Sequence, residues 1–393
     1  MPVAKCFATQ RRRNKRIIDA FLRCLIGILF IYSYCEYLIY YVTQFQCGWP
    51  TLSKDVGSVE PVYAMVLADT HLLGSRNGHW YDKWRREWQM QRAFQTAMTL
   101  HRPNVVFILG DIFDEGKWCP EKEFNEYVER FHSLFKVPID TAMYVAVGNH
   151  DIGFHYRITP HLAKRFEDKM NSPPVRLVSI RGNHFVLINS MAMEGDGCSL
   201  CSRAVREIDK IADILRCSNG SALCKGGIKI DNYSRPILMQ HYPLYRESDS
   251  VCTEADAAPL PQRNDRFEER WDCLSRESTE YLVEALRPRA ALGGHTHHGC
   301  AVRHSFAPAR RRGIEFVEYT VPSFSWRNRL DPKYYLLTIT PEELKMSKCG
   351  LHRELTMQVT ALLMLLALVV YLYFRARADH QCHAYKLLSG KKV

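Results

Sequence analysis

Apolar residues form one long run near each end of the chain. The run at 25–42 carries a single charge, Glu36, and the run at 356–374 carries none. A helix rises about 1.5 Å per residue, so ~20 apolar residues can cross a hydrocarbon core about 30 Å thick. The pattern therefore predicts transmembrane helices at 23–43 and 356–374.

A cleaved secretory signal is the alternative interpretation of the first run. The residues that follow it, Thr43 to Gln46, show no small-x-small cleavage pattern. An uncleaved anchor is therefore favoured. Glu36 is then expected near the membrane interface or facing the second helix, rather than at an intramembrane functional site.

Between these runs the apolar residues gather into short segments. Those at 62–68, 105–109 and 143–147 are nearly continuous and rich in β-branched residues, which is typical of strands buried on both faces. Helices are expected between them at 80–100 and 121–135. This order predicts a βαβαβ unit with parallel strands.

The later segments favour a mixed sheet. Strands 175–180 and 185–189 are expected to form a hairpin, with Asn183 and His184 in its turn. Further strands are expected at 236–240, 289–292, 315–321 and 334–340, and helices at 204–215 and 269–286. The pattern predicts an α/β domain at 60–342, with a surface insertion at 194–235 that is rich in Cys, Gly and Ser.

The chain is basic only at its ends. Of the formal net charge of +11 over 393 residues, residues 1–16 contribute +6 and residues 375–393 contribute +4. The central part is nearly neutral, so the charge does not indicate a nucleic-acid partner. The Lys/Arg bias predicts cytosolic tails at 1–22 and 375–393, with a lumenal domain between the two spans.

Two further features agree with a lumenal domain. Asn219 and Asn232 begin N-glycosylation sequons, and ten cysteines lie between the spans, an even number that suggests disulfides. Four of these cysteines crowd together in the insertion, and Cys198-x-x-Cys201 has the spacing of zinc ligands. Disulfides are favoured over zinc for this group, and their connectivity stays open. The group comprises Cys198, Cys201, Cys217 and Cys224.

Polar blocks follow five of the expected strands. Because the carboxyl ends of neighbouring strands meet at one edge of an α/β sheet, their side chains are expected to converge. Each block alone is a weak signal, but five in order are hard to explain by chance. The blocks are Asp69-Thr70-His71, Gly110-Asp111-Ile112-Phe113-Asp114, Gly148-Asn149-His150-Asp151, His241 and Gly293-Gly294-His295-Thr296-His297.

In these blocks the sequence resembles the calcineurin-like metallophosphoesterase superfamily, whose pattern is D-x-H, GD-x-x-D, GNH-[DE], H and GH-x-H. The resemblance implies a four-layer α/β/β/α sandwich flanked by the two transmembrane helices. It also implies a dinuclear metal centre that hydrolyses phosphoric esters. Mn²⁺ is the expected ion, with Zn²⁺ and iron as alternatives.

The resemblance also implies a role for each site residue. Asp69, His71 and His297 would hold one metal; Asn149, His241 and His295 would hold the other; and Asp111 would bridge them. His150 would protonate the leaving alkoxide, oriented by Asp114. Asp151 is expected to tie its loop, and His155 and His298 are interpreted as solvated loop histidines.

The membrane anchors narrow the resemblance to the Cdc1-type membrane branch of the superfamily. The closer match rests on residues of the first span and on the blocks 68–74 and 240–246. It implies a phosphodiesterase that removes an ethanolamine-phosphate side branch from a mannose of glycosylphosphatidylinositol anchors and so assists export of anchored proteins. The span residues are Tyr34, Glu36, Tyr37, Leu38 and Tyr40.

This branch implies location and partners as well. Residence in membranes of the endoplasmic reticulum, the ER-Golgi intermediate compartment and the cis-Golgi is expected. GPI-anchored proteins would be the substrates, and the tail would meet cargo receptors and coat proteins. The tail departs from a dilysine retrieval signal, because Ser389 and Gly390 occupy the positions five and four from the end.

Two other classes of function remain open. One is a lumenal phosphatase or pyrophosphatase that acts on a different lipid-linked phosphate. The other is a non-catalytic scaffold with the same fold. Loss of metal ligands would indicate the scaffold, and here every ligand position of the pattern is filled.

Overall fold

The structure is a computed structural model that describes residues 2–53, 60–220, 228–230, 232–306 and 313–388. The chain divides into two compact units. One is Gln44–Leu351, and the other combines Met1–Thr43 with His352–Val393. Each unit is described separately.

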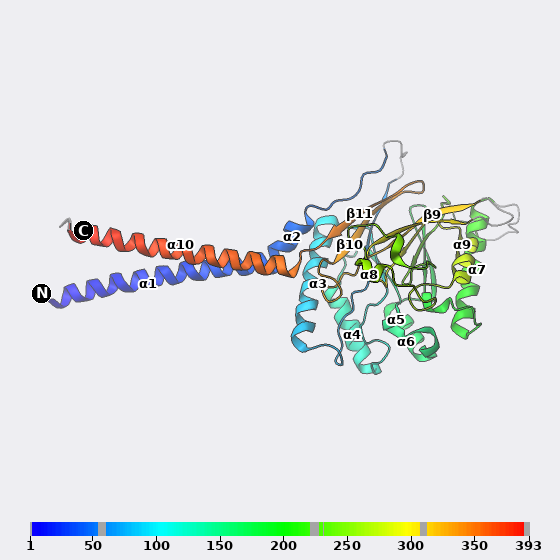
Figure 1. Cartoon of the computed structure of the whole chain (residues 1–393), viewed down its shortest axis with the longest axis horizontal. Helices are drawn as coiled ribbons and strands as arrows, with labels where there is room; N and C mark the ends of the chain where they lie inside the picture. The colour runs from blue at the N-terminus through cyan, green and yellow to red at the C-terminus, as the bar shows by residue number, and fades with distance from the viewer. Residues whose placement is uncertain (1, 54–59, 221–227, 231, 307–312, 389–393) are drawn as a thin grey trace. The chain divides into compact units, whose positions relative to one another are not determined.

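The terminal unit is helical. It contains α1 (Pro2–Ser33), a π-helical turn (Tyr34–Leu38), α2 (Ile39–Gln44) and α10 (Glu354–Leu388). Helices α1 and α10 pack against each other, and Gly27 allows the side chain of Leu368 to approach closely (Figure 1). The stretches Ile17–Gln44 and Glu354–Ala378 are long and apolar enough to cross a membrane. These two apolar helices indicate membrane association.

The first sheet of the other unit has the strand order β11-β10-β1-β2-β3. β1, β2 and β3 are parallel, and β10 is antiparallel to both β1 and β11. This confirms the predicted βαβαβ unit. The elements are β1 (Val62–Leu67), α3 (Trp80–His101), β2 (Val105–Leu109), α4 (Glu121–Leu134), β3 (Ala142–Ala146), β10 (Lys333–Ile339) and β11 (Leu344–Gly350).

The second sheet has the strand order β4-β5-β6-β7-β9-β8. β5, β6, β7 and β9 run parallel, and the outer strands β4 and β8 are antiparallel to their neighbours. The strands are β4 (Val175–Ile180), β5 (Asn183–Ile188), β6 (Ile237–Gln240), β7 (Ala290–Gly293), β8 (Cys300–Phe306) and β9 (Ile314–Thr320). The helices of this part are α5 (Asn149–Ile152), α6 (Pro160–Met170), α7 (Ser199–Ser218), α8 (Leu260–Arg263) and α9 (Arg276–Leu286).

The two sheets enclose one apolar core. Val66 and Phe107 of the first sheet and Phe185 and Leu292 of the second belong to the same buried cluster. Helices α3 and α4 lie on one side of the sheets and α7 and α9 on the other (Figure 1). This is the expected α/β/β/α sandwich with two mixed sheets.

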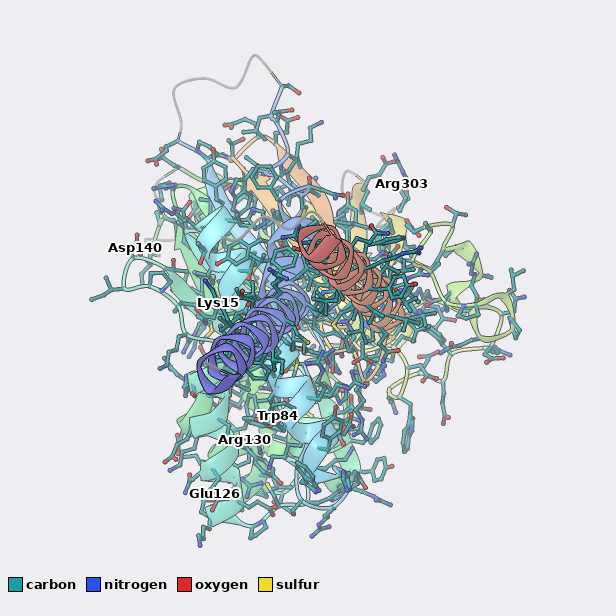
Figure 2. The ribbon with its side chains drawn as sticks, turned by 90° about the vertical axis from the view of Figure 1, so that its left-hand side faces the viewer. Lys15, Trp84, Glu126, Arg130, Asp140 and Arg303 are labelled. Carbon is teal, nitrogen blue, oxygen red and sulfur yellow. A yellow bond between two sulfur atoms is a disulfide. The ribbon has the colours of Figure 1, made fainter. Side chains whose placement is uncertain are left out.

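Helices α3 and α4 lie side by side along the outer face of the first sheet. Arg130 of α4 forms an ion pair with Glu87 of α3 and donates to the carbonyl of Leu73 at 2.9 Å. Figure 2 labels Arg130, which comes from α4, and Trp84, which comes from α3. Arg130 therefore ties both helices to the segment that follows β1.

Some elements differ from the sequence-based expectation. Asn183 and His184 begin strand β5, and the turn before them is formed by Arg181 and Gly182, with φ of 47° and 74°. His184 Nδ1 lies 2.9 Å from Ser179 Oγ across the hairpin, so its ring is held within the sheet. Strands β8 and β11 were not expected, and α9 begins at Arg276 instead of 269.

The cysteines divide between disulfides and thiols. Cys47–Cys349 and Cys252–Cys300 are disulfides, and Cys217 is also disulfide-bonded. Among the described residues of this unit, four cysteines are thiols instead, so the disulfide expectation was too broad; they are Cys119, Cys198, Cys201 and Cys273. Cys224 lies outside the described residues. Asn219 and Asn232 are both exposed, and Ser221 of the first sequon is outside the described residues.

Candidate metal centre

The nine site residues predicted from the sequence all lie where strands of the two sheets end. Asp69, Asp111 and Asn149 follow β1, β2 and β3 of the first sheet. His241 and His295 follow β6 and β7 of the second sheet. The centre is therefore built between the two sheets, at the edge to which their parallel strands point.

The backbone at this edge is unusual. Five of the seven expected metal ligands have positive φ, a region that side chains other than Gly rarely adopt. Hydrogen bonds hold this backbone: Ser323 Oγ donates to the carbonyl of Asp69 at 2.7 Å, and His71 N donates to the carbonyl of Asp111 at 2.9 Å. The five residues are Asp69 (54°), His71 (44°), Asp111 (46°), His295 (73°) and His297 (62°).

Two glycines allow the ligands to approach one another. Gly110 has φ of 81°, and a Cβ there would overlap the ring of His241. A Cβ at Gly148 would overlap the backbone nitrogen and carboxylate of Asp111. Larger residues at these positions would push the second-sheet histidine or the central carboxylate out of place.

The first group of donors comprises Asp69, His71 and His297, whose donor atoms lie within 4.8 Å of one another. His71 Nε2 is 3.1 Å from His297 Nε2, and His297 Nε2 is 3.9 Å from Asp69 Oδ1. Two imidazole nitrogens that face each other at this distance share at most one hydrogen. A cation between them would use both lone pairs.

The second group of donors comprises Asp111, His241 and His295, with Asn149 beside them. His241 Nε2 lies 3.0 Å from Asn149 Oδ1, 3.2 Å from His295 Nδ1 and 3.4 Å from Asp111 Oδ1. The other oxygen of Asp111, Oδ2, lies 3.5 Å from Nε2 of His71 in the first group. Asp111 thus offers one oxygen to each group, as a bridging carboxylate would.

Hydrogen bonds outside the two groups orient three of the imidazole rings. His241 Nδ1 donates to the carbonyl of Leu109 at 2.9 Å, and His295 Nε2 donates to the carbonyl of Trp271 at 2.8 Å. His71 Nδ1 donates to Asp114 Oδ1 at 3.1 Å. In the neutral form of each ring the remaining nitrogen carries a lone pair that points into the centre, so the donor set fits divalent metal ions.

Asp114 contacts both His71 and His150. Its carboxylate bonds His71, whereas His150 Nδ1 lies 3.0 Å from the backbone carbonyl of Asp114 and 3.6 Å from its carboxylate. The backbone N–H of His150 donates to Asp111 Oδ1 at 2.8 Å. The side chain of His150 is 32% exposed, while that of His71 is 4% exposed. His150 is thus open to a substrate beside the buried ligands.

Asp151 ties the loop after β3 to the loop after β2. Its Oδ1 accepts from Phe113 N at 2.9 Å, and its Oδ2 accepts from Gly148 N at 2.8 Å. His298 and His155, interpreted from the sequence as solvated, have partners: His298 Nδ1 accepts from Arg329 at 2.6 Å, and His155 Nε2 lies 2.7 Å from Asp196 Oδ2.

Burial and mutual charge shift the pKa values of the donors. Burial raises the pKa of Asp69 to about 7, although the charge of His241 opposes this. Burial lowers the pKa of His241, but the Asp111 carboxylate outweighs burial and raises it to about 9. Burial and the charge of His241 lower the pKa of His295 to about 3. In the metal-free centre, bound protons thus neutralise the negative charge of the buried carboxylates, a role that metal cations would take when bound.

A cavity of about 530 Å³ was not expected from the sequence, and two of its lining residues are bonded to the centre: Lys117 N donates to the carbonyl of His150 at 3.0 Å, and the carbonyl of Trp271 accepts from His295. Its lining includes Phe154, Tyr156 and Trp271, whose rings lie together, with centroids 4.2 Å and 5.4 Å from that of Trp271. Lys117 lies in the same lining, 4.8 Å from the ring of Trp118. Phe154 and Tyr156 lie at one short turn and Trp271 comes from a distant loop, so no local sequence pattern indicated the group.

Comparison with known proteins agrees with this centre. The family model Calcineurin-like phosphoesterase matches residues 63–299. Metallophosphoesterase 1 of Macaca fascicularis is 48% identical over 346 residues, covering 86% of this chain and 85% of that protein. The Danio rerio protein of that name is 44% identical over 340 residues, covering 85% and 86%. The Mus musculus protein is 47% identical over 370 residues, covering 91% and 90%.

The family match covers more than half of the chain, and its limits enclose the blocks from Asp69 to His297. The relatives match over most of their own length as well. Together with the paired donor groups, these similarities imply a dinuclear metal site and a metal-dependent phosphoesterase. The chain belongs to the calcineurin-like phosphoesterase family.

Proposed function

We propose that this phosphoesterase is a phosphodiesterase that removes an ethanolamine-phosphate side branch from a mannose of glycosylphosphatidylinositol anchors. The aromatic cavity whose lining residues Lys117 and Trp271 are bonded to the metal centre carries the proposal. Aromatic faces attract cations such as the ethanolamine ammonium and cover the apolar faces of sugars. Lys117 in the same lining would pair with the phosphate.

The residues of the chain would act as follows. When bound, two metal ions would supply an activated water and neutralise charge on the phosphoryl oxygens. His150, held through Nδ1 by the carbonyl of Asp114, would present Nε2 to the leaving oxygen and donate a proton to it. The Asp114 carboxylate would fix the ring of His71 as a ligand of one metal. Asp111, which lies between the two donor groups, would set the spacing of the two metals.

The metal and the compartment belong to the same proposal. Imidazole, carboxylate and amide donors suit Mn²⁺, and Zn²⁺ or iron are the alternatives. The basic tails favour cytosolic termini and a lumenal catalytic unit in the endoplasmic reticulum, the ER-Golgi intermediate compartment and the cis-Golgi. GPI-anchored proteins would be the substrates, and cargo receptors and coat proteins would meet the cytosolic tail. The exposed Asn219 and Asn232 would carry glycans.

Mass spectrometry of anchor glycans tests the substrate. Cells lacking the chain should accumulate anchored proteins that still carry ethanolamine phosphate on the mannose. Re-expression of the unmodified chain should remove this excess, and Asp111→Asn should not, because the central carboxylate offers one oxygen to each donor group. The purified, Mn-loaded full chain should release ethanolamine phosphate from the isolated glycolipid.

The alternative activities predict different results. If side-branch content is unchanged in such cells while the purified chain hydrolyses a dolichyl or diphosphate substrate, the proposed substrate is wrong and a lumenal lipid phosphatase is favoured. If the metal-loaded chain hydrolyses neither class, the scaffold interpretation gains support. The complete donor set argues against that second result.

A further inference from the structure

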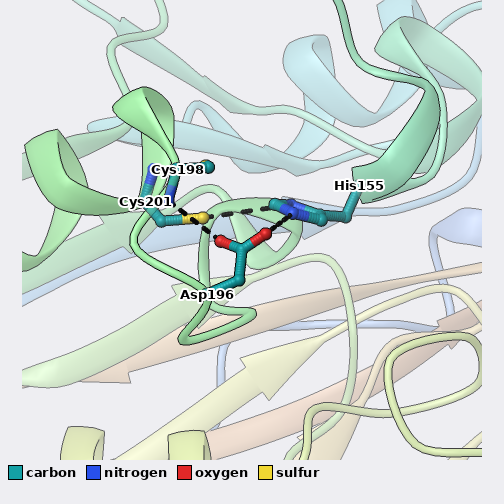
Figure 3. A group of neighbouring side chains, drawn as sticks. All are labelled: His155, Asp196, Cys198 and Cys201. Carbon is teal, nitrogen blue, oxygen red and sulfur yellow. Dashed lines mark hydrogen bonds and ion pairs between the residues drawn. The ribbon is translucent and has the colours of Figure 1, made fainter.

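A second group of metal-binding side chains lies outside the centre described above. It comprises His155, Asp196, Cys198 and Cys201, and one donor atom of each lies within 4.8 Å of those of the other three (Figure 3). His155 begins the 3₁₀ turn His155–Arg157, Asp196 lies in the loop before α7, and the cysteines are at the start of α7. His155 is thus brought to three residues that lie 41 or more positions further along the chain.

The ring of His155 lies between two oxygen acceptors. Nδ1 is 2.9 Å from the carbonyl of Met191, and Nε2 is 2.7 Å from Asp196 Oδ2. A neutral imidazole carries one hydrogen and cannot donate to both. With the hydrogen on Nδ1, the Nε2 lone pair faces the carboxylate, and a cation between these two atoms would satisfy both.

Each of the other donors is also oriented by a neighbouring group. Asp196 Oδ1 accepts from Cys198 N at 3.0 Å, which leaves Oδ2 directed at the ring. Cys198 is the N-cap of α7, and its Sγ accepts from Cys201 N at 3.0 Å. Backbone N–H groups and the positive end of a helix stabilise a thiolate, the form that binds metals. Outer hydrogen bonds of this kind accompany metal ligands in proteins.

We propose that these four side chains bind one Zn²⁺ ion as a site distinct from the dinuclear centre. Two sulfurs, one imidazole and one carboxylate make a complete tetrahedral set for zinc. Zinc bonds of about 2.0–2.3 Å require donors to be about 3.3–3.8 Å apart in such a set. The Nε2–Oδ2 distance of 2.7 Å is shorter than this range, and the four donor atoms all lie within 4.8 Å of one another, so small side-chain rotations would bring them to zinc-bonding distance.

Four protein ligands leave no open position, so this zinc has a structural role. It would fasten the turn at 155–157 to the start of α7. Phe154 and Tyr156 flank His155, and their rings lie on Trp271. The carbonyl of Trp271 accepts from His295 Nε2 in the catalytic centre. The zinc would thus fix the wall of the cavity beside that centre, whichever ester the enzyme cleaves.

Cobalt substitution of the full-length chain in detergent tests the site. Co²⁺ bound to thiolates gives an intense sulfur-to-cobalt charge-transfer absorption, whereas the dinuclear centre contains no thiolate donor among its expected ligands. We expect this absorption in the unmodified chain and its loss in Cys201→Ser. We also expect three metal ions per chain by elemental analysis and two in that variant. Cys119→Ser, which alters a buried thiol outside the group, is the control and should retain both signals.

A second variant keeps the test valid if Cys201→Ser does not fold. The side chain of Asp196 is 52% exposed, so Asp196→Asn should fold and yet lose the third metal at lower chelator concentration. The proposal is overturned if the unmodified chain binds cobalt without thiolate absorption, or if its thiols stay reduced with only two metals bound. A Cys198–Cys201 disulfide, found by peptide mass spectrometry without reduction, would also overturn it.

Discussion

Three of the four ligand imidazoles of the metal centre use one nitrogen for a hydrogen bond outside it. For His71 the outer partner is the Asp114 carboxylate, while His241 and His295 donate to backbone carbonyls. A carbonyl is fixed by the fold, whereas a side-chain carboxylate can be changed by substitution. Asp114 is therefore the position at which the orientation of a ligand can be tested without removing the ligand.

Asp114→Asn should weaken metal binding. The amide can still accept from His71 Nδ1, but it loses the negative charge that makes the ring a better ligand, so metal affinity should fall by about 10- to 100-fold. Chelator competition on the purified chain measures this. If the rate falls while affinity is unchanged, Asp114 acts on His150, as the sequence suggested, and not on His71.

His150→Ala should give the opposite pattern. A donor atom of His150 lies within 4.8 Å of those of His71 and Asp111, but His150 is not one of the seven expected ligands and its ring is partly exposed, so both metals should stay bound. The rate should fall by roughly 10²- to 10⁴-fold because the leaving oxygen loses its proton donor. Loss of both metals with a normal rate per metal pair would contradict this role.

Metal affinity should rise with pH. Burial raises the pKa of Asp69 to about 7, so below that pH the metal must displace a proton from this carboxyl. Metal affinity should rise by up to about tenfold per pH unit for each proton displaced. Because the pKa of His241 is about 9, this rise should continue above pH 7. The same protons stabilise the metal-free fold. The contribution of protonated Asp69 to the free energy of unfolding is therefore lost as pH rises from about 4 to about 7. The contribution of protonated His241 is lost as pH rises from about 6.5 to about 9.

Titrations with a metal chelator at pH 6, 7 and 8 measure the change in affinity. Thermal unfolding of the metal-free chain over the same pH range tests the stability contribution. An affinity that does not change with pH would show that Asp69 and His241 are already deprotonated in the metal-free chain.

At the scale of elements, the centre depends on short turns between strands and helices. Strand β3 passes through Gly148 directly into the single turn of α5, which carries Asn149 and His150. The absence of a side chain at Gly148 lets this turn lie against Asp111. Asp151 holds the loops after β2 and β3 together, because its carboxylate accepts one backbone N–H from each loop.

Gly148→Ala should therefore disrupt the centre while the sheets persist. A methyl group would displace Asp111 or the α5 turn, and displacement of reacting groups by about 1 Å commonly costs 10²-fold in rate. Gly350→Ala is a matched control, because a Cβ there meets no other atom within 4 Å. Activity and bound metal should fall in the first variant only. Equal activity in both would show that the turn can move without cost.

The sequence predicted the elements that are buried on both faces and the polar blocks that follow them. Strands β8 and β11 were not predicted, because many of their residues are partly exposed and the sequence there has no continuous apolar run. Asn149 and His150 were found because their motif is local. Trp271 and the partnership of His155 with Asp196 were missed because they depend on how distant loops meet, which no local pattern records.

At the scale of the whole molecule, two disulfides close loops of very different length. Cys47 and Cys349 are separated by 302 positions, and Cys252 and Cys300 by 48. A crosslink that closes a longer loop removes more conformational entropy from the unfolded chain. The longer one is therefore expected to contribute more to stability.

Replacing each pair by serines tests this expectation. Loss of Cys47–Cys349 should lower the free energy of unfolding by about 2–5 kcal/mol, and by roughly 1–2 kcal/mol more than loss of Cys252–Cys300. Thermal unfolding of the metal-loaded chain under identical detergent conditions compares them. A larger effect from the shorter loop would show that local packing around Cys252 and Cys300 outweighs loop length.

Cys47 and Cys349 lie close to the two points, Gln44 and Leu351, where the chain enters and leaves the unit that holds the metal centre. A pulling force applied to the two terminal helices would pass along the backbone to these cysteines and across the bond between their sulfurs. The 301 residues enclosed by that bond would carry no tension. The catalytic unit is thus mechanically insulated from its anchors for as long as the disulfide stays oxidised.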